Sequence, residues 1–355
     1  MKKILLLGEY SGLHTNLKKG LEELGHKVVL ASDGDGKKGI HGDISLKLER
    51  DNKISKFFEL NKIINEFNGF DIVQLINPYI TPNKYITLFY DKIFKSNQKV
   101  YCLAAGDDYF YSEAVLRQAF QKYTPFDNDL LKGEELPYHT KLDYILQKRV
   151  LNKVDGIIPI MYEYAHSYRN SIFASKTMKT IPLPIDVSNI VYTENIVREG
   201  KIVFYHGITR PEFKGTSYIT EAMKLAKEKY PNDIEIIISP VLPLKEYLKM
   251  INRVNVVIDQ CRSYSYGMNA VYSMAMGKVV MSGCEHECLE ELDFIESEII
   301  NIQPNVNQIL NQIEKLIEQK DEILEIGKNN RKFAESHHSH KEIAKKFLES
   351  WQPIQ

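Results

Sequence analysis

The chain has 355 residues, of which 43% are hydrophobic and 26% charged, and its formal net charge is −1. This length favours two domains, and the composition is typical of a soluble globular protein. Without a basic excess to neutralise a phosphate backbone, we expect no nucleic-acid partner. The longest apolar run is far too short to cross a membrane, and the N-terminal run is too short for a secretory signal. Four scattered cysteines favour reduced thiols and a cytoplasmic location.

Short apolar runs alternate with helical periodicity through the first half of the chain. We predict strands over residues 3–8, 27–32, 71–77, 99–106, 155–161 and 179–184, with helices between them. Strands that are apolar throughout and separated by helices indicate a parallel sheet covered on both faces. Residues 107–141, rich in Tyr, Phe and acids, interrupt this alternation. We expect this long insertion to be functional, with a decorated pair of surface helices as the alternative.

The alternation restarts after a patternless segment, residues 186–200, which we interpret as a linker. Strands are predicted over residues 201–207, 233–239, 254–259 and 278–283, with helices over 216–231, 243–253 and 268–277. Three further helices close the chain, over residues 306–319, 322–336 and 341–351. The predicted class is α/β, with two Rossmann-like domains of residues 1–185 and 201–335.

Two glycine turns follow predicted strands. "GEYSGLHTN" precedes the first helix, and its Gly12 and His14 could face the cleft, although His14 could equally be a helix-start histidine with no function. "YHGITRPEFKG" places Arg210 and Lys214 just beyond Gly207. A guanidinium fork and an ammonium point charge together suit a diphosphate, and two solvated loop cations are the alternative.

A third motif, "VVIDQCRSYSYGMNAVYSMAMG", follows another predicted strand. The strand ends at Asp259, and a loop leads to Gly267, which permits close approach of a ligand. Asn269 can cap the helix, and the free N–H groups of residues 268–270 can meet phosphate. A buried core helix is the alternative, and for the methionine-rich end we prefer it.

These motifs resemble those of the GT-B glycosyltransferases, in particular the retaining enzymes of glycosyltransferase family 4. "HGITRPEFKG" is similar to the family's G-R-x-x-x-K-G motif. The third stretch resembles E-G-F-G-x-x-x-x-E-A-M-A-x-G-x-P-V. The two family glutamates fall on Tyr264 and Tyr272, which makes this chain divergent. "LAAGDDY" is similar to the family's H-G-x-D, with Ala105 at the histidine position.

The resemblance implies two domains facing across a cleft, with a last helix, residues 336–355, crossing back to the first domain. It implies transfer of a hexose from a nucleotide diphosphate-sugar to a glycan or lipid-linked acceptor in surface polysaccharide biosynthesis. We expect retention of configuration, no metal, no cofactor, and a cytoplasmic protein with possible peripheral membrane contact. The implied phosphate-stabilising residues are Arg210 and Lys214, the donor-binding residues are Gly207, Asp259, Tyr264, Tyr266, Gly267, Met268, Asn269 and Tyr272, and the cleft residues on the acceptor side are Gly12, His14, Gly106, Asp107 and Asp108.

Two other classes stay open at this point. One is a non-catalytic GT-B protein that binds a nucleotide-sugar or glycan and supports a partner transferase, which the loss of both glutamates favours. The other is a GT-B epimerase acting on the nucleotide-sugar itself, which would need acid–base groups in the cleft.

Overall fold

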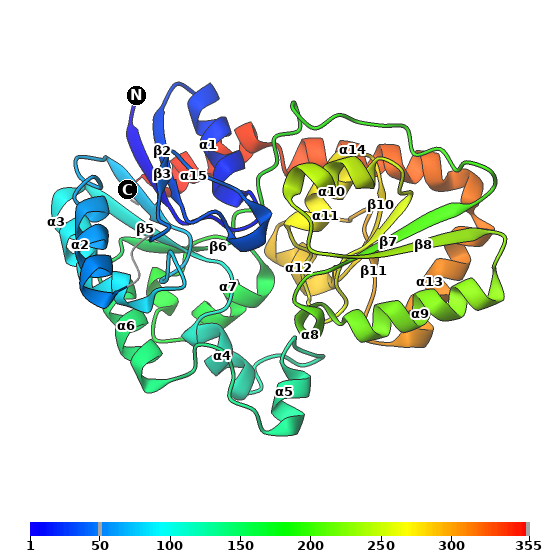
Figure 1. The fold of residues 1–355 in the computed structure, drawn as a ribbon, viewed down its shortest axis with the longest axis horizontal. Coiled ribbons are helices and arrows are strands. Elements are labelled where there is room, and N and C mark those ends of the chain that lie inside the picture. Colours follow the sequence, from blue (N-terminus) through cyan, green and yellow to red (C-terminus); the bar gives the residue numbers. More distant parts are fainter. Residues whose placement is uncertain (49–51, 353–355) are drawn as a thin grey trace.

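The computed structural model describes residues 1–48 and 52–352, and two parallel sheets lie side by side in it (Figure 1). The first sheet has the order β3-β2-β1-β4-β5-β6, which is the Rossmann order. Its strands are β1 (Lys3–Leu7), β2 (Lys27–Ser32), β3 (Ile44–Ser45), β4 (Ile72–Leu75), β5 (Lys99–Ala104) and β6 (Gly156–Pro159).

The second sheet has the order β11-β10-β9-β7-β8, the other common doubly wound arrangement. Its strands are β7 (Ile202–Ile208), β8 (Ile234–Pro240), β9 (Val256–Ile258), β10 (Val279–Ser282) and β11 (Ile300–Asn301). Every strand pair in both sheets is parallel. The predicted class, α/β with two Rossmann-like halves, is therefore confirmed.

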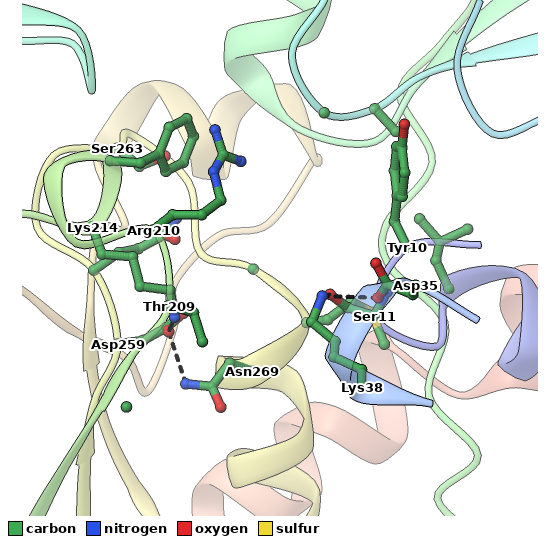
Figure 2. A pocket seen from close by; sticks show the side chains of 18 of the residues that line it. Tyr10, Ser11, Asp35, Lys38, Thr209, Arg210, Lys214, Asp259, Ser263 and Asn269 are labelled. Carbon is green, nitrogen blue, oxygen red and sulfur yellow. Dashed lines mark hydrogen bonds and ion pairs between the residues drawn. The ribbon is translucent and has the colours of Figure 1, made fainter. Parts of the chain in front are cut away.

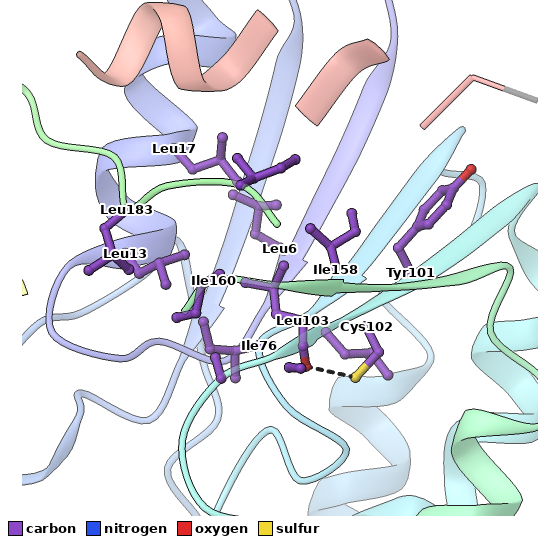
Figure 3. Packing of buried hydrophobic residues seen from close by; sticks show 14 of the residues in the cluster. Leu6, Leu13, Leu17, Ile76, Tyr101, Cys102, Leu103, Ile158, Ile160 and Leu183 are labelled. Atoms are coloured by element: carbon purple, nitrogen blue, oxygen red, sulfur yellow. Dashed lines mark hydrogen bonds between the residues drawn. The ribbon is translucent and has the colours of Figure 1, made fainter. Parts of the chain in front are cut away.

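Helices cover the faces of both sheets, as parallel strands require. Those of the first half are α1 (Leu13–Glu23), α2 (Lys53–Ile64), α3 (Tyr90–Ser96), α4 (Tyr109–Leu116), α5 (Asp127–Lys132), α6 (Lys141–Leu151) and α7 (Tyr162–Arg169). Those of the second half are α8 (Pro211–Lys214), α9 (Thr216–Lys229), α10 (Leu244–Ile251), α11 (Met268–Ala275), α12 (His286–Glu291), α13 (Val306–Glu318), α14 (Ile323–His337) and α15 (His340–Ser350). Figure 3 shows how Leu6, Leu103 and Ile158, from three strands, pack with Leu17 of α1 in the first core.

The strand predicted over residues 179–184 does not form. Pro182 and Pro184 have no N–H group to donate to a neighbouring strand, so a regular ladder is impossible there. Only the N–H of Ile181 reaches the sheet edge, where it donates to the carbonyl of Pro159 at 3.0 Å. The two-residue strands β3 and β11 were not predicted, because two residues are too few to show a period.

The insertion between β5 and α6 contacts the second domain. Lys122 forms an ion pair with Glu285 at 2.6 Å, and the hydroxyl of Tyr123 donates to the same carboxylate at 2.6 Å. The backbone N–H of Lys122 also donates to the hydroxyl of Tyr264 at 2.8 Å. The insertion therefore fastens the two domains together beside the cavity described below.

The last helix returns to the first domain. α15 packs against α1, and the close approach of the His340 carbonyl to Gly20 leaves no room for a Cβ there. At its end, the indole N–H of Trp351 donates to the side chain of Gln74 at 3.2 Å. Residues 353–355, the end of the segment predicted as the crossing helix, lie outside the described residues.

Candidate functional site

A cavity of about 660 Å³ lies between the two domains. Its lining residues follow the carboxyl ends of strands in both sheets, the place where open α/β sheets bind ligands. Arg210, Asp259 and Asn269 come from the second domain and face Tyr10 and Asp35 of the first (Figure 2).

Arg210 follows β7 and precedes α8, where Pro211 fixes the first helical residue. Its φ of 52° is left-handed, a strained conformation for a residue with a Cβ. Its guanidinium lies 3.8 Å from the centre of the Phe213 ring and forms an ion pair with Asp107 of the first domain. Arg210 is thus held at the cavity, and it bridges the two domains.

Lys214 lies at the end of α8 and forms an ion pair with Asp259, the residue after β9. The Lys214 side chain is 13% exposed and that of Asp259 only 1%. Asn269 donates to the same carboxylate oxygen at 2.7 Å. Because an ammonium carries three N–H donors, Lys214 keeps donors for a ligand while Asp259 fixes its position.

The N-terminus of α11 points at the same wall of the cavity. Gly267 precedes the helix without a side-chain cap, and a Cβ there would meet only ordinary contacts. The N–H of Ala270 donates to the Gly267 carbonyl at 3.0 Å, so of the three N–H groups expected to be free, those of Met268 and Asn269 alone can serve a ligand.

The first-domain rim is built on the turn after β1. Ser11 donates its backbone N–H to Asp35 at 2.7 Å, and Lys38 bonds the Ser11 hydroxyl at 2.7 Å and Asp35 at 2.8 Å. Ser11 and Asp35 both have left-handed φ values, of 56° and 50°. With Arg210 and Tyr138, whose φ is 57°, four such non-glycine residues line one cavity, a clustering that is typical of functional sites.

Gly12 and His14 do not line the cavity, contrary to the expectation for this turn. Glu9 caps α1 from within: its carboxylate accepts the N–H groups of Gly12 at 2.9 Å and Thr15 at 2.8 Å, so they are closed to a ligand. Burial raises the pKa of Glu9 to about 7. His14 is fully buried, contacts the Gly8 carbonyl at 2.7 Å, and has a pKa lowered to about 4 by burial. It is a neutral core residue.

The two aspartates after β5 have different surroundings. Asp107 and Gly106 line the cavity, whereas Asp108 is buried and caps α4 by accepting the N–H of Tyr111 at 2.8 Å. The hydroxyl of Tyr168 donates to the other oxygen of Asp108 at 2.6 Å. Burial raises the pKa of Asp108 to about 6. Asp108 is therefore structural, which corrects its expected place in the cleft.

Of the three tyrosines expected to bind the donor, only Tyr272 lines the cavity. Tyr264 and Tyr266 are 2% exposed and do not line the cavity, contrary to expectation. Their rings are buried at the domain contact, Tyr264 against Tyr162 at 5.2 Å, and Tyr266 with its hydroxyl 3.0 Å from Nε2 of His338. The physical reason for Tyr264 is that its ring packs within an aromatic cluster at the domain contact, which also includes Phe120 at 5.9 Å and Tyr123 at 5.4 Å between ring centres.

Tyr272 does line the cavity, as do Gly207 and Met268. Its hydroxyl accepts a hydrogen bond from Asn16 of α1 at 3.0 Å and so joins the second domain to the first. Burial raises the pKa of Tyr272 to about 12, so the group is a neutral hydroxyl at pH 7.

Several cavity residues were missed in the sequence. Glu163 of α7 is the most notable, because its carboxyl side chain belongs to a residue that is 3% exposed and yet lines the cavity. It follows β6 by four residues, so the rule that ligands meet the carboxyl ends of strands could have identified it. The same rule applies to Tyr10 and Ser11 after β1 and to Asp35 after β2.

Among residues 1–48 and 52–352, no group of three or more His, Cys, Asp and Glu side chains is arranged to hold a metal ion. In the same part of the chain, no helix combines the length and apolarity needed to cross a bilayer. All four cysteines are buried and free.

Comparison with known proteins places the fold. No protein-family model matches the chain, and no curated protein matches it. Among solved structures, HepE of Anabaena in complex with UDP and glucose is similar over 100% of both chains, with 12% identity and a TM-score of 0.64. Sucrose-phosphate synthase of Thermosynechococcus elongatus is similar over 99% of this chain and 98% of its own, with 14% identity and a TM-score of 0.64.

An alpha-glucosyltransferase in complex with UDP and a 13-mer DNA is similar over 98% of both chains, with 10% identity and a TM-score of 0.62. These likenesses extend over both domains and over almost the full length of each chain. This chain itself has two parallel doubly wound sheets, with a cavity between their carboxyl edges. The chain therefore has the GT-B fold.

Proposed function

We propose that this protein is a glycosyltransferase that transfers a hexose from a nucleotide diphosphate-sugar to a glycan or lipid-linked acceptor. One observation carries the proposal: Arg210, Lys214 and the uncapped N-terminus of α11 converge on one wall of the interdomain cavity. Two cations and a helix N-terminus together suit a diphosphate. Structures of similar fold that hold UDP, or UDP with glucose, support a nucleotide-sugar as the ligand.

In the proposed reaction, Arg210 and Lys214 stabilise the negative charge that grows on the departing diphosphate. Asp259 positions Lys214 through their ion pair. The bond between the anomeric carbon and the diphosphate oxygen breaks, and the sugar becomes an oxocarbenium-like cation. The departing phosphate accepts the proton of the acceptor hydroxyl, whose oxygen bonds to the anomeric carbon on the same face. This course retains the anomeric configuration and requires neither a metal nor a strong protein base, in keeping with Ala105 at the family's histidine position. Tyr10 and Ser11 of the facing wall receive the acceptor.

An apolar patch on the first domain supports a lipid-linked acceptor and peripheral membrane contact in a cytoplasmic protein. Ile54, Phe57 and Phe58 of α2 are 72%, 52% and 65% exposed, and Leu88 nearby is 48% exposed. The Phe57 ring lies 4.9 Å from that of Phe89, which fixes the patch to the body of the domain. Exposed aromatic and aliphatic side chains of an amphipathic helix are typical of a membrane-surface contact.

Co-sedimentation with vesicles of 30% anionic lipid measures this contact. We expect the Phe57→Ser/Phe58→Ser variant to lose binding, while its turnover of a water-soluble acceptor stays unchanged. Equal sedimentation of the variant and the unaltered protein would remove the membrane contact from the proposal.

The transferase itself is tested by thermal-shift screening with UDP-, GDP-, ADP- and TDP-sugars, followed by product analysis with a panel of acceptors. A ligand at a hundred times its Kd stabilises by about 2.7 kcal/mol, so binding is readily seen. A glycosylated acceptor supports the transferase. An isomerised nucleotide-sugar formed without an acceptor identifies an epimerase instead, and tight binding without any turnover identifies a non-catalytic binding protein. No stabilisation by any of these ligands would reject the proposal.

A further inference from the structure

Two carboxylates on the cavity wall each keep one oxygen without a partner. Within the described residues, Oδ1 of Asp107 and Oε2 of Glu163 are buried and make no hydrogen bond. The Asp107 side chain is 10% exposed, and Glu163 is 3% exposed. Both residues belong to the first domain, and both line the cavity.

The second domain holds the other oxygen of each carboxylate. Oε1 of Glu163 accepts the hydroxyl of Ser263 and the backbone N–H of Ser265, the latter at 2.8 Å. Oδ2 of Asp107 accepts from the guanidinium of Arg210. Each carboxylate is therefore fixed in orientation by one oxygen, which leaves the other as a preorganised acceptor.

The same two tyrosines lie near both carboxylates. Tyr111 and Tyr164 line the cavity, and their rings meet edge to face at 5.3 Å. Burial raises the pKa of both tyrosines, and electrostatic interaction with Asp107 and Glu163 raises it further. This corner of the cavity therefore combines two free acceptors with neutral aromatic surface.

A buried acceptor without a partner is costly, so a ligand that donates hydrogen bonds gains by entering here. Phosphate oxygens accept hydrogen bonds and repel carboxylates, so the diphosphate is excluded from this corner. A sugar presents several hydroxyl donors and an apolar ring face, and it would lie next to the phosphates held by Arg210.

We propose that Oδ1 of Asp107 and Oε2 of Glu163 bind two hydroxyl groups of the donor's sugar, and that this pair selects the sugar. The inference rests on the proposed function and adds to it the part of the cavity that holds the hexose.

Glu163→Gln is the decisive variant, because the glutamine carbonyl keeps the bonds to Ser263 and Ser265 while its NH₂ group replaces the free acceptor. Titration calorimetry measures the affinity of UDP and of UDP-glucose, and their ratio isolates the sugar's contribution. If UDP-glucose is not bound, the best nucleotide-sugar and its nucleoside diphosphate replace this pair. We expect the ratio to fall about 10- to 100-fold in Glu163→Gln, with UDP affinity unchanged.

Asp107→Asn should lower the same ratio. Glu212→Gln is the matched control, because Glu212 is an exposed carboxylate two residues from Arg210 that does not line the cavity. It should leave both affinities unchanged. Donors that each lack one hydroxyl extend the test: the donor missing the hydroxyl bound by Glu163 should lose affinity for the unaltered protein but not for Glu163→Gln.

The outcomes separate the two proposals. If the unaltered protein binds a nucleotide-sugar and Glu163→Gln leaves the ratio unchanged, or lowers nucleotide and nucleotide-sugar affinity equally, the sugar-binding role is wrong and the proposed function stands. If the unaltered protein binds no nucleotide or nucleotide-sugar, both proposals are wrong.

Discussion

Lys214→Met tests the phosphate assignment, but the structure predicts that it also destabilises the protein. The Asp259 carboxylate is 1% exposed, and without Lys214 it would keep only the hydrogen bond from Asn269. Removing one partner of a buried ion pair costs about 3–5 kcal/mol. At about 2–4 °C per kcal/mol, the expected fall in Tm is roughly 6–20 °C. A loss of activity in this variant alone would therefore be ambiguous.

The double variant Lys214→Met/Asp259→Asn resolves the ambiguity. It leaves no unpaired buried charge, and the asparagine oxygen still accepts from Asn269, so most of the lost stability should return. Turnover should stay at least about a hundredfold below that of the unaltered protein, because nothing replaces the ammonium at the diphosphate. Thermal unfolding and initial rates at saturating nucleotide-sugar measure the two effects. Turnover that recovers together with Tm would refute the phosphate role of Lys214.

Three further variants have distinct expectations. Arg210→Ala should lower turnover about a hundredfold and also lower Tm, because it leaves the Asp107 carboxylate, 10% exposed, without its ion-pair partner; an unchanged Tm would contradict this. Burial lowers the pKa of His338 to about 4, so its contribution to stability is complete above pH 6.5 and is lost as the pH falls toward 4; at pH 5.5 the loss is about 1.4 kcal/mol. Urea midpoints at pH 7.5 and 5.5 should therefore differ less for His338→Gln than for the unaltered protein. Gly283→Ala would place a Cβ 1.8 Å from the Ser263 carbonyl oxygen, so we expect a loss of about 1–3 kcal/mol in urea unfolding; an unchanged midpoint would show that the loop yields freely.

The sequence determined the elements of the fold, because hydrophobic periodicity and the Gly and Pro residues that end helices and strands are local features. Residues 27–32 were predicted as a strand and form β2 with the same bounds, and the helix predicted over 216–231 is α9, Thr216–Lys229. Arg210 and Lys214 were also found locally, since both follow a strand end closely. The apolar run of residues 179–184 predicted a strand that does not form, because its two prolines have no N–H group to donate to a neighbouring strand.

The tertiary structure alone decided which strand-end residues face the cavity. Asp107 and Asp108 are adjacent, yet one pairs with Arg210 across the domains and the other caps α4. Glu163 accepts a hydrogen bond from Ser263, a hundred residues away, and no local pattern can predict such a contact. Orientation at a strand end depends on the packing of distant segments and on where buried charges find partners, and these are properties of the assembled domains rather than of any stretch of sequence.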